Sequence, residues 1–160
     1  MIIRLAAEAD IPKILDLLLQ VGQVHHQLRP DIFRAQAQKY NEEALKALLK
    51  DESRPIYVAE EEDGVAGYCF CVRKEFDDTG AFTRRRELYI DDLCVDAGSR
   101  GRGVATALYR HVRKLAGEMG CAFVTLNVWC GNENAWKFYE KMGLRPRSVM
   151  MEVPLEEETC

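Results

Sequence analysis

The sequence predicts a single α/β (α+β) domain, built on a mixed central sheet with helices on both faces. The chain has 160 residues, and 48% of them are hydrophobic, which fits one domain with a substantial core. Helical and strand patterns alternate along the chain. No internal repeat or linker separates them, so we expect all elements to share one core.

The first third of the chain predicts a strand and two helices. The strand covers residues 1–5. Apolar residues then recur at three- and four-residue steps, which predicts an amphipathic helix that Gly22 is expected to end or kink. Residues 24–33 are expected to form an irregular connector, a kind of segment that often carries specificity. Asn41 can cap a second helix that reaches residue 50.

The rest of the chain predicts more strands and two more helices. An Asp-Gly pair in the turn at 62–64 favours a hairpin, and a loop is expected over 76–82. An acidic tail over 156–160 follows the predicted domain, which covers 1–155. The predicted strands cover 56–60, 65–72, 88–95, 121–129 and 149–155, and the predicted helices cover 103–119 and 135–142.

Charge and composition exclude several classes of protein. Lys and Arg number 22 against 26 Asp and Glu, and the net charge of −4 argues against nucleic acid as a partner. No apolar run approaches the ~18 residues of a membrane span, and Glu8 and Asp10 stand where a signal peptide is apolar, so we expect a cytoplasmic protein with no membrane partner. The six cysteines fit buried hydrophobes or free thiols, and no metal site is expected because no Cys/His pairs follow zinc spacing.

The glycine-rich segment 95–106 carries the clearest chemical signal. It joins an apolar strand to a helix, where glycines let backbone amides approach a ligand and the helix start adds partial positive charge. These features suit a phosphate or pyrophosphate. The segment lacks the Gly-Lys-Ser/Thr of a Walker loop, and Thr106 stands where a Rossmann fingerprint needs Gly or Ala. An ordinary glycine-rich turn with solvated arginines is the alternative.

Two motifs, in order along the chain, resemble one known family. Arg100-x-x-Gly103-x-Ala105, directly after an apolar strand, resembles the acetyl-CoA loop of the GCN5-related N-acetyltransferase (GNAT) superfamily. About one helix and one strand later, Asn132-x-x-Ala135-x-x-Phe138-Tyr139-x-x-x-Gly143-Leu144 resembles its second signature. The resemblance covers 87–144. It implies a GNAT-like, mostly antiparallel sheet in which strands 4 and 5 splay apart, with acetyl-CoA as cosubstrate and no metal.

The resemblance also implies how acetyl-CoA is held. Backbone groups at the end of the third long strand would pair with the pantetheine amides, and main-chain donors of the glycine loop would wrap the pyrophosphate, with the arginines adding charge. Asn132 would bond the pantetheine arm, cap the following helix, or do both. The residues assigned to acetyl-CoA are Leu93, Cys94, Val95, Arg100, Gly101, Arg102, Gly103, Val104, Ala105, Thr106, Asn132 and Tyr139.

The catalytic candidates are a tyrosine and two aspartates. By the resemblance, the phenol of Tyr139 would protonate the departing thiolate; the alternative is a core aromatic side chain. Many protein-acetylating members of the family carry a carboxylate base at the position of Tyr89 or Asn127, and neither is a carboxylate here. Asp91-Asp92 offers a substitute, and its strand resembles that of diamine and polyamine acetyltransferases.

The two aspartates are adjacent, which constrains their roles. Neighbouring residues of a regular strand point to opposite faces, unless a bulge redirects one of them. Asp91 is assigned to proton removal through water and Asp92 to orientation or structure, with the two roles exchangeable. Glu87 is a weaker candidate at the frayed start of the strand, beside a triple arginine at 84–86 that is expected in a solvated loop.

The acceptor side is the least defined part of the predicted site. Its candidate substrate contacts are His26, Phe33, Tyr89 and Asn127. The leading interpretation is direct transfer of an acetyl group to a primary amine of a small, cationic acceptor, since the chain is acidic and carries the Asp91-Asp92 pair. Acetylation of a protein or peptide N-terminus or lysine, a non-catalytic acyl-CoA-binding domain, and a homodimer all stay open.

Overall fold

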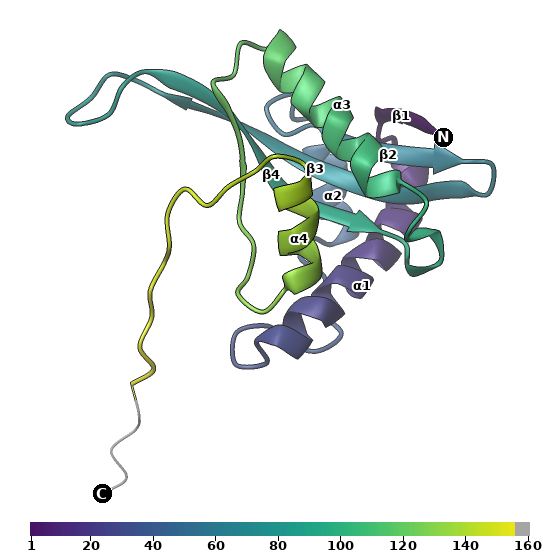
Figure 1. Ribbon diagram of the computed structural model, residues 1–160. Helices are drawn as coiled ribbons and strands as arrows, with labels where there is room; N and C mark the ends of the chain where they lie inside the picture. The colour runs from purple at the N-terminus through teal and green to yellow at the C-terminus, as the bar shows by residue number, and fades with distance from the viewer. Residues whose placement is uncertain (156–160) are drawn as a thin grey trace, which may run out of the picture.

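A five-stranded sheet with helices on both sides forms residues 1–155, the part of the chain that this computed structural model describes (Figure 1). Short 3-10 turns η1 (Glu8–Asp10) and η2 (Ala97–Ser99) precede α1 and α3. The strands are β1 (Ile2–Leu5), β2 (Ile56–Glu61), β3 (Gly64–Phe76), β4 (Arg85–Val95) and β5 (Phe123–Leu126). The helices are α1 (Ile11–Leu28), α2 (Glu42–Leu48), α3 (Val104–Glu118) and α4 (Glu133–Lys141).

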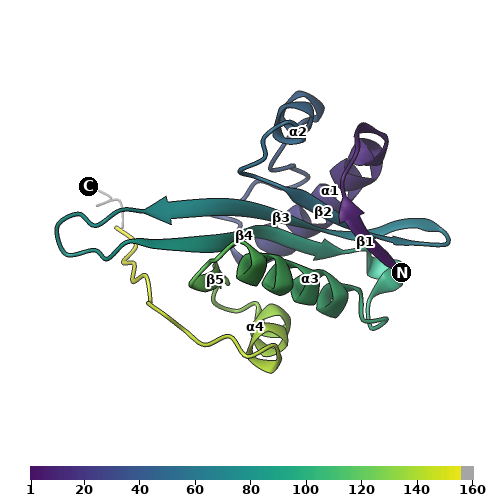
Figure 2. The same ribbon diagram turned by 90° about the horizontal axis from the view of Figure 1, so that it is seen from above.

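The strands follow one another across the sheet in chain order. The first four strands pair antiparallel, whereas β4 and β5, which α3 connects, pair parallel. Helices α1 and α2 cover one face, and α3 and α4 cover the other (Figure 2). Fully buried Ile14 and Leu18 of α1 pack with Tyr68 on the first face, and Leu108 of α3 packs with Leu88 on the second. The mixed, mostly antiparallel sheet with helices on both faces is therefore confirmed.

The parallel pairing of β4 and β5 is short. It runs from Glu87 opposite Phe123 to Ile90 opposite Leu126. There β5 ends, while β4 continues to Val95 on the support of β3 alone. The predicted splay of the two strands is thus present, and β5 is shorter than the expected 121–129.

β4 also contains a bulge at the acidic pair. Adjacent residues of β3 pair with Ile90 and Asp92, so Asp91 is an extra residue on β4. The bulge shifts the side-chain alternation by one position. Ile90 therefore packs in the core beneath α3, whereas Asp92 bonds the Tyr68 hydroxyl on the α1 side.

The first helix continues through Gly22, and the expectation that this glycine ends or kinks it is wrong. A Cβ at position 22 would collide with the carbonyl oxygen of Ala37, so the glycine allows the connection between α1 and α2 to pass close to the backbone of α1. The helix reaches Leu28, and His25 and His26 are helical. The irregular connector predicted over 24–33 therefore begins later. The cap at Asn41 is confirmed, because its side chain accepts a hydrogen bond from the amide of Ala44.

Two expectations near the strand ends are also wrong. Arg85 and Arg86 belong to β4 rather than to a solvated loop, and Arg86 bonds the carbonyl of Met119 at 2.5 Å. Within residues 1–155 no strand follows α4, so the strand predicted over 149–155 is not formed in this chain. The predicted tail at 156–160 lies outside the described residues.

Glu87 is buried rather than frayed. Its side chain is 4% exposed and lies 2.7 Å from Arg85 and 2.9 Å from Arg147. Burial works to raise the pKa of this carboxyl, but the hydrogen bonds from the two arginines outweigh burial and lower it. Glu87 therefore ties the start of β4 to the chain after α4, and its surroundings favour a structural role over a catalytic one.

We expect Glu87→Gln to reduce the free energy of unfolding by about 1–3 kcal/mol at pH 7, because two arginines lose a charged acceptor. Because the pKa of Glu87 is lower in the folded state, its ionised carboxyl adds stability at pH values above the unfolded pKa of about 4.3. This stability is lost as the pH falls through the folded-state pKa. The deficit should therefore shrink in acid. Urea unfolding at several pH values measures it. Glu75→Gln, in an exposed pair with two arginines, is the control and should change stability by less than about 0.5 kcal/mol; equal losses would contradict the account.

Candidate active site

The open side of β4 forms the centre of the candidate site. From Asp92 to Val95 the strand bonds β3 on one side only, because β5 has ended. Backbone groups that point away from β3 therefore lack a strand partner within the described chain, and an extended polar ligand can pair with them. Leu93, Cys94 and Val95 lie in this stretch as predicted. The Cys94 thiol is buried toward Leu17, and burial raises its pKa to about 12, so this residue offers its backbone and not its sulfur.

The glycine loop continues directly from the open strand. Asp96 fixes its beginning by accepting a hydrogen bond from the Gly98 amide at 2.9 Å and by pairing with Lys13 of α1. Gly101 and Gly103 then adopt φ of +76° and +84°, a left-handed conformation that other residues rarely take. A Cβ at either glycine would meet no atom within 4 Å, so open space lies in front of both.

The loop ends at the start of α3. The first amides of an α-helix have no partner inside the helix, so Val104, Ala105 and Thr106 can direct N–H groups at an anion. The two arginines of the loop differ in their surroundings. Arg100 is exposed, whereas Arg102 pairs with Glu61 at 3.1 Å. Main-chain donors and Arg100 are therefore the available anion contacts, with Arg102 partly engaged elsewhere.

Tyr139 extends from α4 against α3. Its ring makes edge contacts with Tyr109 at 6.5 Å and with Phe138 at 5.0 Å between centroids. Burial, followed by the nearby Cys69 thiol and Asp92 carboxylate, raises the pKa of Tyr139 above its usual value. The phenol therefore stays protonated at neutral pH and is suited to donate a proton. Asn132 caps the same helix by accepting a hydrogen bond from the Ala135 amide at 3.3 Å, in agreement with one of its two predicted roles.

The bulge brings both aspartates to the α1 side, where their surroundings differ. Asp91 accepts a hydrogen bond from the Tyr40 hydroxyl at 2.7 Å and pairs with Lys39 at 2.9 Å. Burial works to raise the pKa of Asp91, but these two partners outweigh burial and lower it. Asp92 accepts a hydrogen bond from the Tyr68 hydroxyl at 3.0 Å, and burial raises its pKa to about 6. One carboxyl is thus held ionised, whereas the other titrates close to neutrality.

Lys39 and Tyr40 are site residues that the sequence analysis did not identify. Both belong to the connection between α1 and α2. Tyr40 stacks on Phe70 with 5.5 Å between ring centroids and accepts a hydrogen bond from Arg54 at 3.1 Å. Burial, then Asp91, raises the pKa of Tyr40 to about 12. No sequence motif marks these residues, because their contacts with β4 depend on the tertiary fold.

The structure joins the predicted acceptor residues in two pairs. Asn127 donates a hydrogen bond to the Tyr89 hydroxyl at 3.1 Å. His26 bonds the carbonyl of Phe33 at 2.7 Å, which fixes the end of α1 against the connector. The Phe33 ring also meets Trp129 edge-on, with 5.1 Å between centroids. Trp129, another residue that the sequence analysis did not identify, thus links this connector to the chain after β5.

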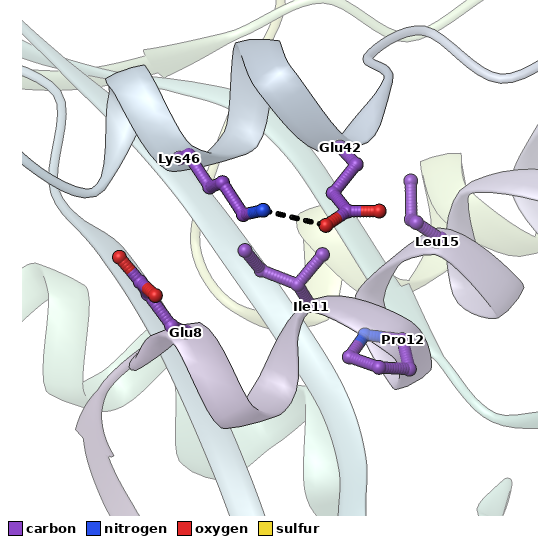
Figure 3. Close-up of a pocket in the computed structure, with 6 residues that line it drawn as sticks. All are labelled: Glu8, Ile11, Pro12, Leu15, Glu42 and Lys46. Atoms are coloured by element: carbon purple, nitrogen blue, oxygen red, sulfur yellow. Dashed lines mark hydrogen bonds and ion pairs between the residues drawn. The ribbon is translucent and has the colours of Figure 1, made fainter.

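Two surface hollows lie away from the open edge of β4. One, of about 390 Å³, is between α1 and α2 and is crossed by the Lys46–Glu42 ion pair (Figure 3). The other, of about 380 Å³, lies between the end of α1 and the start of α4, with Leu28 and Asn132 on its walls. Neither hollow is lined by Asp91, Asp92 or Tyr139, so the open edge of β4 defines the site better than either hollow.

No group of three or more His, Cys, Asp or Glu among residues 1–155 is placed to hold a metal ion. In that same part of the chain, no helix has the length and apolar character needed to cross a membrane.

Curated relatives match part of the chain. "Putative phosphinothricin acetyltransferase YwnH" of Bacillus subtilis is 32% identical over 97 residues, which are 58% of this chain and 54% of that protein. An uncharacterized N-acetyltransferase of Methanocaldococcus jannaschii is 28% identical over 105 residues, which are 66% of this chain and 45% of that protein. The chain thus spans about half the length of the curated relatives it matches.

Solved structures and a family model match more of the chain. A crystal structure of a mutant BH1408 protein from Bacillus halodurans is 28% identical, with a TM-score of 0.94 over 98% of this chain and 100% of that one. A "Putative acetyltransferase" from Agrobacterium tumefaciens, 20% identical, shares the fold with a TM-score of 0.72 over 97% of this chain and 100% of that one. The model of the Acetyltransferase (GNAT) family matches residues 23–144, which include both motifs. The chain therefore belongs to the GNAT family of acetyltransferases.

Proposed function

We propose that this protein transfers an acetyl group from acetyl-CoA to a primary amine of a small acceptor, directly within a ternary complex. One observation carries the proposal: the unpaired side of β4 leads without interruption into the glycine loop and the start of α3. This path offers strand-like backbone partners at one end and anion-binding amides at the other. Pantetheine carries amides and its pyrophosphate is anionic, so the two ends suit the two parts of acetyl-CoA.

The residues on this path have distinct tasks in the proposal. Backbone groups of 93–95 bond the pantetheine, and the amides of 101–106 bind the pyrophosphate, to which Arg100 adds charge. The open space in front of Gly101 and Gly103 supports this arrangement, because no atom of the described residues lies within 4 Å of an added Cβ at either position. Asn132 caps α4 and is also assigned to the pantetheine arm.

Gly103→Glu should weaken acetyl-CoA binding at least about tenfold, because the new carboxylate enters the space assigned to the pyrophosphate. Gly120→Glu is the matched control. Gly120 also has a positive φ and no atom within 4 Å of an added Cβ, but it lies beyond the other end of α3. Isothermal titration calorimetry with acetyl-CoA, together with circular dichroism of each variant, measures the effect. Equal affinities of two folded variants would contradict the loop assignment.

Proton transfer is assigned to two side chains near the open edge. Tyr139 protonates the thiolate as the carbon–sulfur bond breaks, a role supported by its place in the second motif and by a phenol that is protonated at neutral pH. We assign removal of the amine proton to Asp92 through a water molecule and orientation to Asp91, which exchanges the roles first assigned from the sequence. The pKa of Asp92, near 6, suits a base at neutral pH, whereas Asp91 is already engaged by Lys39 and Tyr40.

Tyr139→Phe should lower kcat by about 10²–10⁴-fold and leave acetyl-CoA affinity unchanged, because it removes one proton donor and keeps the packed ring. Tyr109→Phe is the control, since Tyr109 belongs to the same aromatic cluster and has no assigned proton transfer. Release of free thiol measures turnover. If Tyr139→Phe turns over like the wild type, water or the substrate protonates the thiolate instead.

The pH dependence of kcat/KM should reveal the base. The acceptor binds as an ammonium and passes its proton through water to ionised Asp92, so log kcat/KM should rise with pH up to about 6 and level off once Asp92 is ionised. Asp92→Asn should remove this rise and lower kcat, whereas Asp91→Asn should keep it and raise KM. If Asp91→Asn, and not Asp92→Asn, removes the rise below about pH 6, Asp91 is the base.

The nature of the acceptor is the most specific part of the proposal. A small cationic amine is supported by the net charge of −4 and by the Asp91-Asp92 pair, which resembles that of diamine and polyamine acetyltransferases. Lys39 already pairs with Asp91, so such an acceptor has to compete with this lysine for the carboxylate. Thiol release with a panel of small amines and peptides at fixed acetyl-CoA tests the class. Activity on peptides alone would overturn the proposal of a small acceptor. A lack of activity with every amine would overturn the proposal that the protein acetylates amines.

A further inference from the structure

The first turn of the glycine loop contains a carboxylate, although the loop is assigned to an anionic ligand. Asp96 follows β4 directly, and its Oδ1 accepts a hydrogen bond from the Gly98 amide at 2.9 Å. Its backbone carbonyl accepts another from the Ser99 amide at 2.9 Å, so Asp96 closes this turn. A carboxylate beside a pyrophosphate disfavours binding of the ligand unless a cation offsets its charge.

Helix α1 supplies a cation for this carboxylate. Lys13 pairs with the other oxygen of Asp96, Oδ2, and this hydrogen bond is the main cause that lowers the pKa of Asp96. The Asp96 side chain is 21% exposed, so salt screens this pair less than it screens a fully exposed pair. Lys13 also lies 3.2 Å from Asp16, but the Asp16 side chain is 54% exposed. The charge of Lys13 therefore offsets mainly the charge of Asp96.

A second side chain of α1 holds the same turn and carries no charge. Gln20 accepts a hydrogen bond from the Ala97 amide at 3.1 Å and donates one to Oδ2 of Asp96 at 3.3 Å. Gln20, together with the bond between Asp96 and Gly98, can therefore keep the turn in place when Lys13 is replaced. The turn would then lose a positive charge rather than its anchor.

The other carboxylate at the loop is offset in the same way. Glu61 pairs with Arg102 at 3.1 Å, and the Glu61 side chain is 15% exposed. Arg100 is the exposed arginine of the loop. Because both carboxylates have a basic partner, the charge of Arg100 remains available to a ligand. Loss of Lys13 would set the charge of Asp96 against that of Arg100.

We propose that Lys13 is a positioning residue for acetyl-CoA, because it offsets the charge of Asp96 and so lets this carboxylate close the loop while the adjacent amides bind the pyrophosphate. The inference rests on the proposed function, which takes the loop as the pyrophosphate site. Lys13 acts through Asp96 and makes no contact with the ligand. Helix α1, which lies outside both sequence motifs, thus joins the groups that determine acetyl-CoA affinity.

Opposite changes of charge at the two residues separate this role from a structural one. Lys13→Met should weaken acetyl-CoA binding at least about fivefold, because Asp96 is left without its cation. Asp96→Asn should bind acetyl-CoA more tightly than the wild type, because the amide oxygen can still accept from Gly98 and the negative charge is gone. An ion pair with a merely structural role would make both variants weaker. Isothermal titration calorimetry with acetyl-CoA, together with circular dichroism of each variant, measures the effects.

Two further variants and the kinetics complete the test. Lys46→Met is the matched control, since Lys46 is also a helical lysine paired with a carboxylate, that of Glu42 at 2.6 Å, but it lies on α2 away from the loop. Its affinity for acetyl-CoA should change by less than about twofold, and Lys13→Arg, which keeps the charge, should do the same. In steady-state turnover, Lys13→Met should raise KM for acetyl-CoA and leave kcat unchanged, because the lysine affects binding alone.

Failure of this inference and failure of the proposed function give different results. A wild type that does not bind acetyl-CoA would overturn the proposed function, and the inference with it. When the wild type binds, three results would each overturn the role of Lys13 alone: wild-type affinity of Lys13→Met, equal effects of Lys13→Met and Lys46→Met, or an Asp96→Asn variant that binds no more tightly than the wild type. If Lys13→Met does not fold, Lys13→Gln replaces it, with the same expected weakening.

Discussion

The parallel pairing of β4 and β5 stops at Ile90, and the candidate site depends on that stop. β4 remains a strand as far as Val95 because its antiparallel ladder with β3 continues on the other side. Its free side therefore presents ordered backbone groups with no strand partner among residues 1–155. The glycine loop starts where this strand ends, held to α1 by Asp96, so one run of main chain leads from the splay to the first amides of α3. The ladder with β3 at one end and helix α3 at the other hold that run in place.

The bulge at Asp91 determines the electrostatics beside this path. In a regular strand one carboxylate would lie beneath α3, but the extra residue turns both toward α1. Neighbouring carboxylates disfavour each other's ionised form. Lys39 and Tyr40 keep Asp91 ionised, whereas burial raises the pKa of Asp92 to about 6. Identical residue types thus acquire different protonation behaviour from their surroundings, and Lys39 makes the site less negative than the two aspartates alone suggest.

Local patterns predicted much of the fold, because helix periodicity, caps and turns depend on nearby residues. The cap at Asn41 and the apolar face of α1 are examples. Gly22 was misinterpreted because its reason is the carbonyl of Ala37, which approaches α1 only in the folded chain. The two motifs located the glycine loop and Tyr139 for the same local reason. Lys39 escaped notice because its partner Asp91 is distant in sequence, and nothing in its own segment indicates that contact.

The free side of β4, near the centre of the sheet, differs in its chemistry from the outer edge of β5 at the end of the sheet. The edge of β4 is flanked by the glycine loop, the partly buried carboxylates of Asp91 and Asp92, and Tyr139, so a polar ligand can pair there and leave again. A strand at that position would block this exchange, and the early end of β5 prevents it. The outer edge of β5 instead bears exposed Phe123, whose ring centroid lies 4.8 Å from the Arg147 guanidinium. The unpaired backbone therefore suits an extended polar ligand at β4, where the glycine loop and the start of α3 continue the path with anion-binding amides.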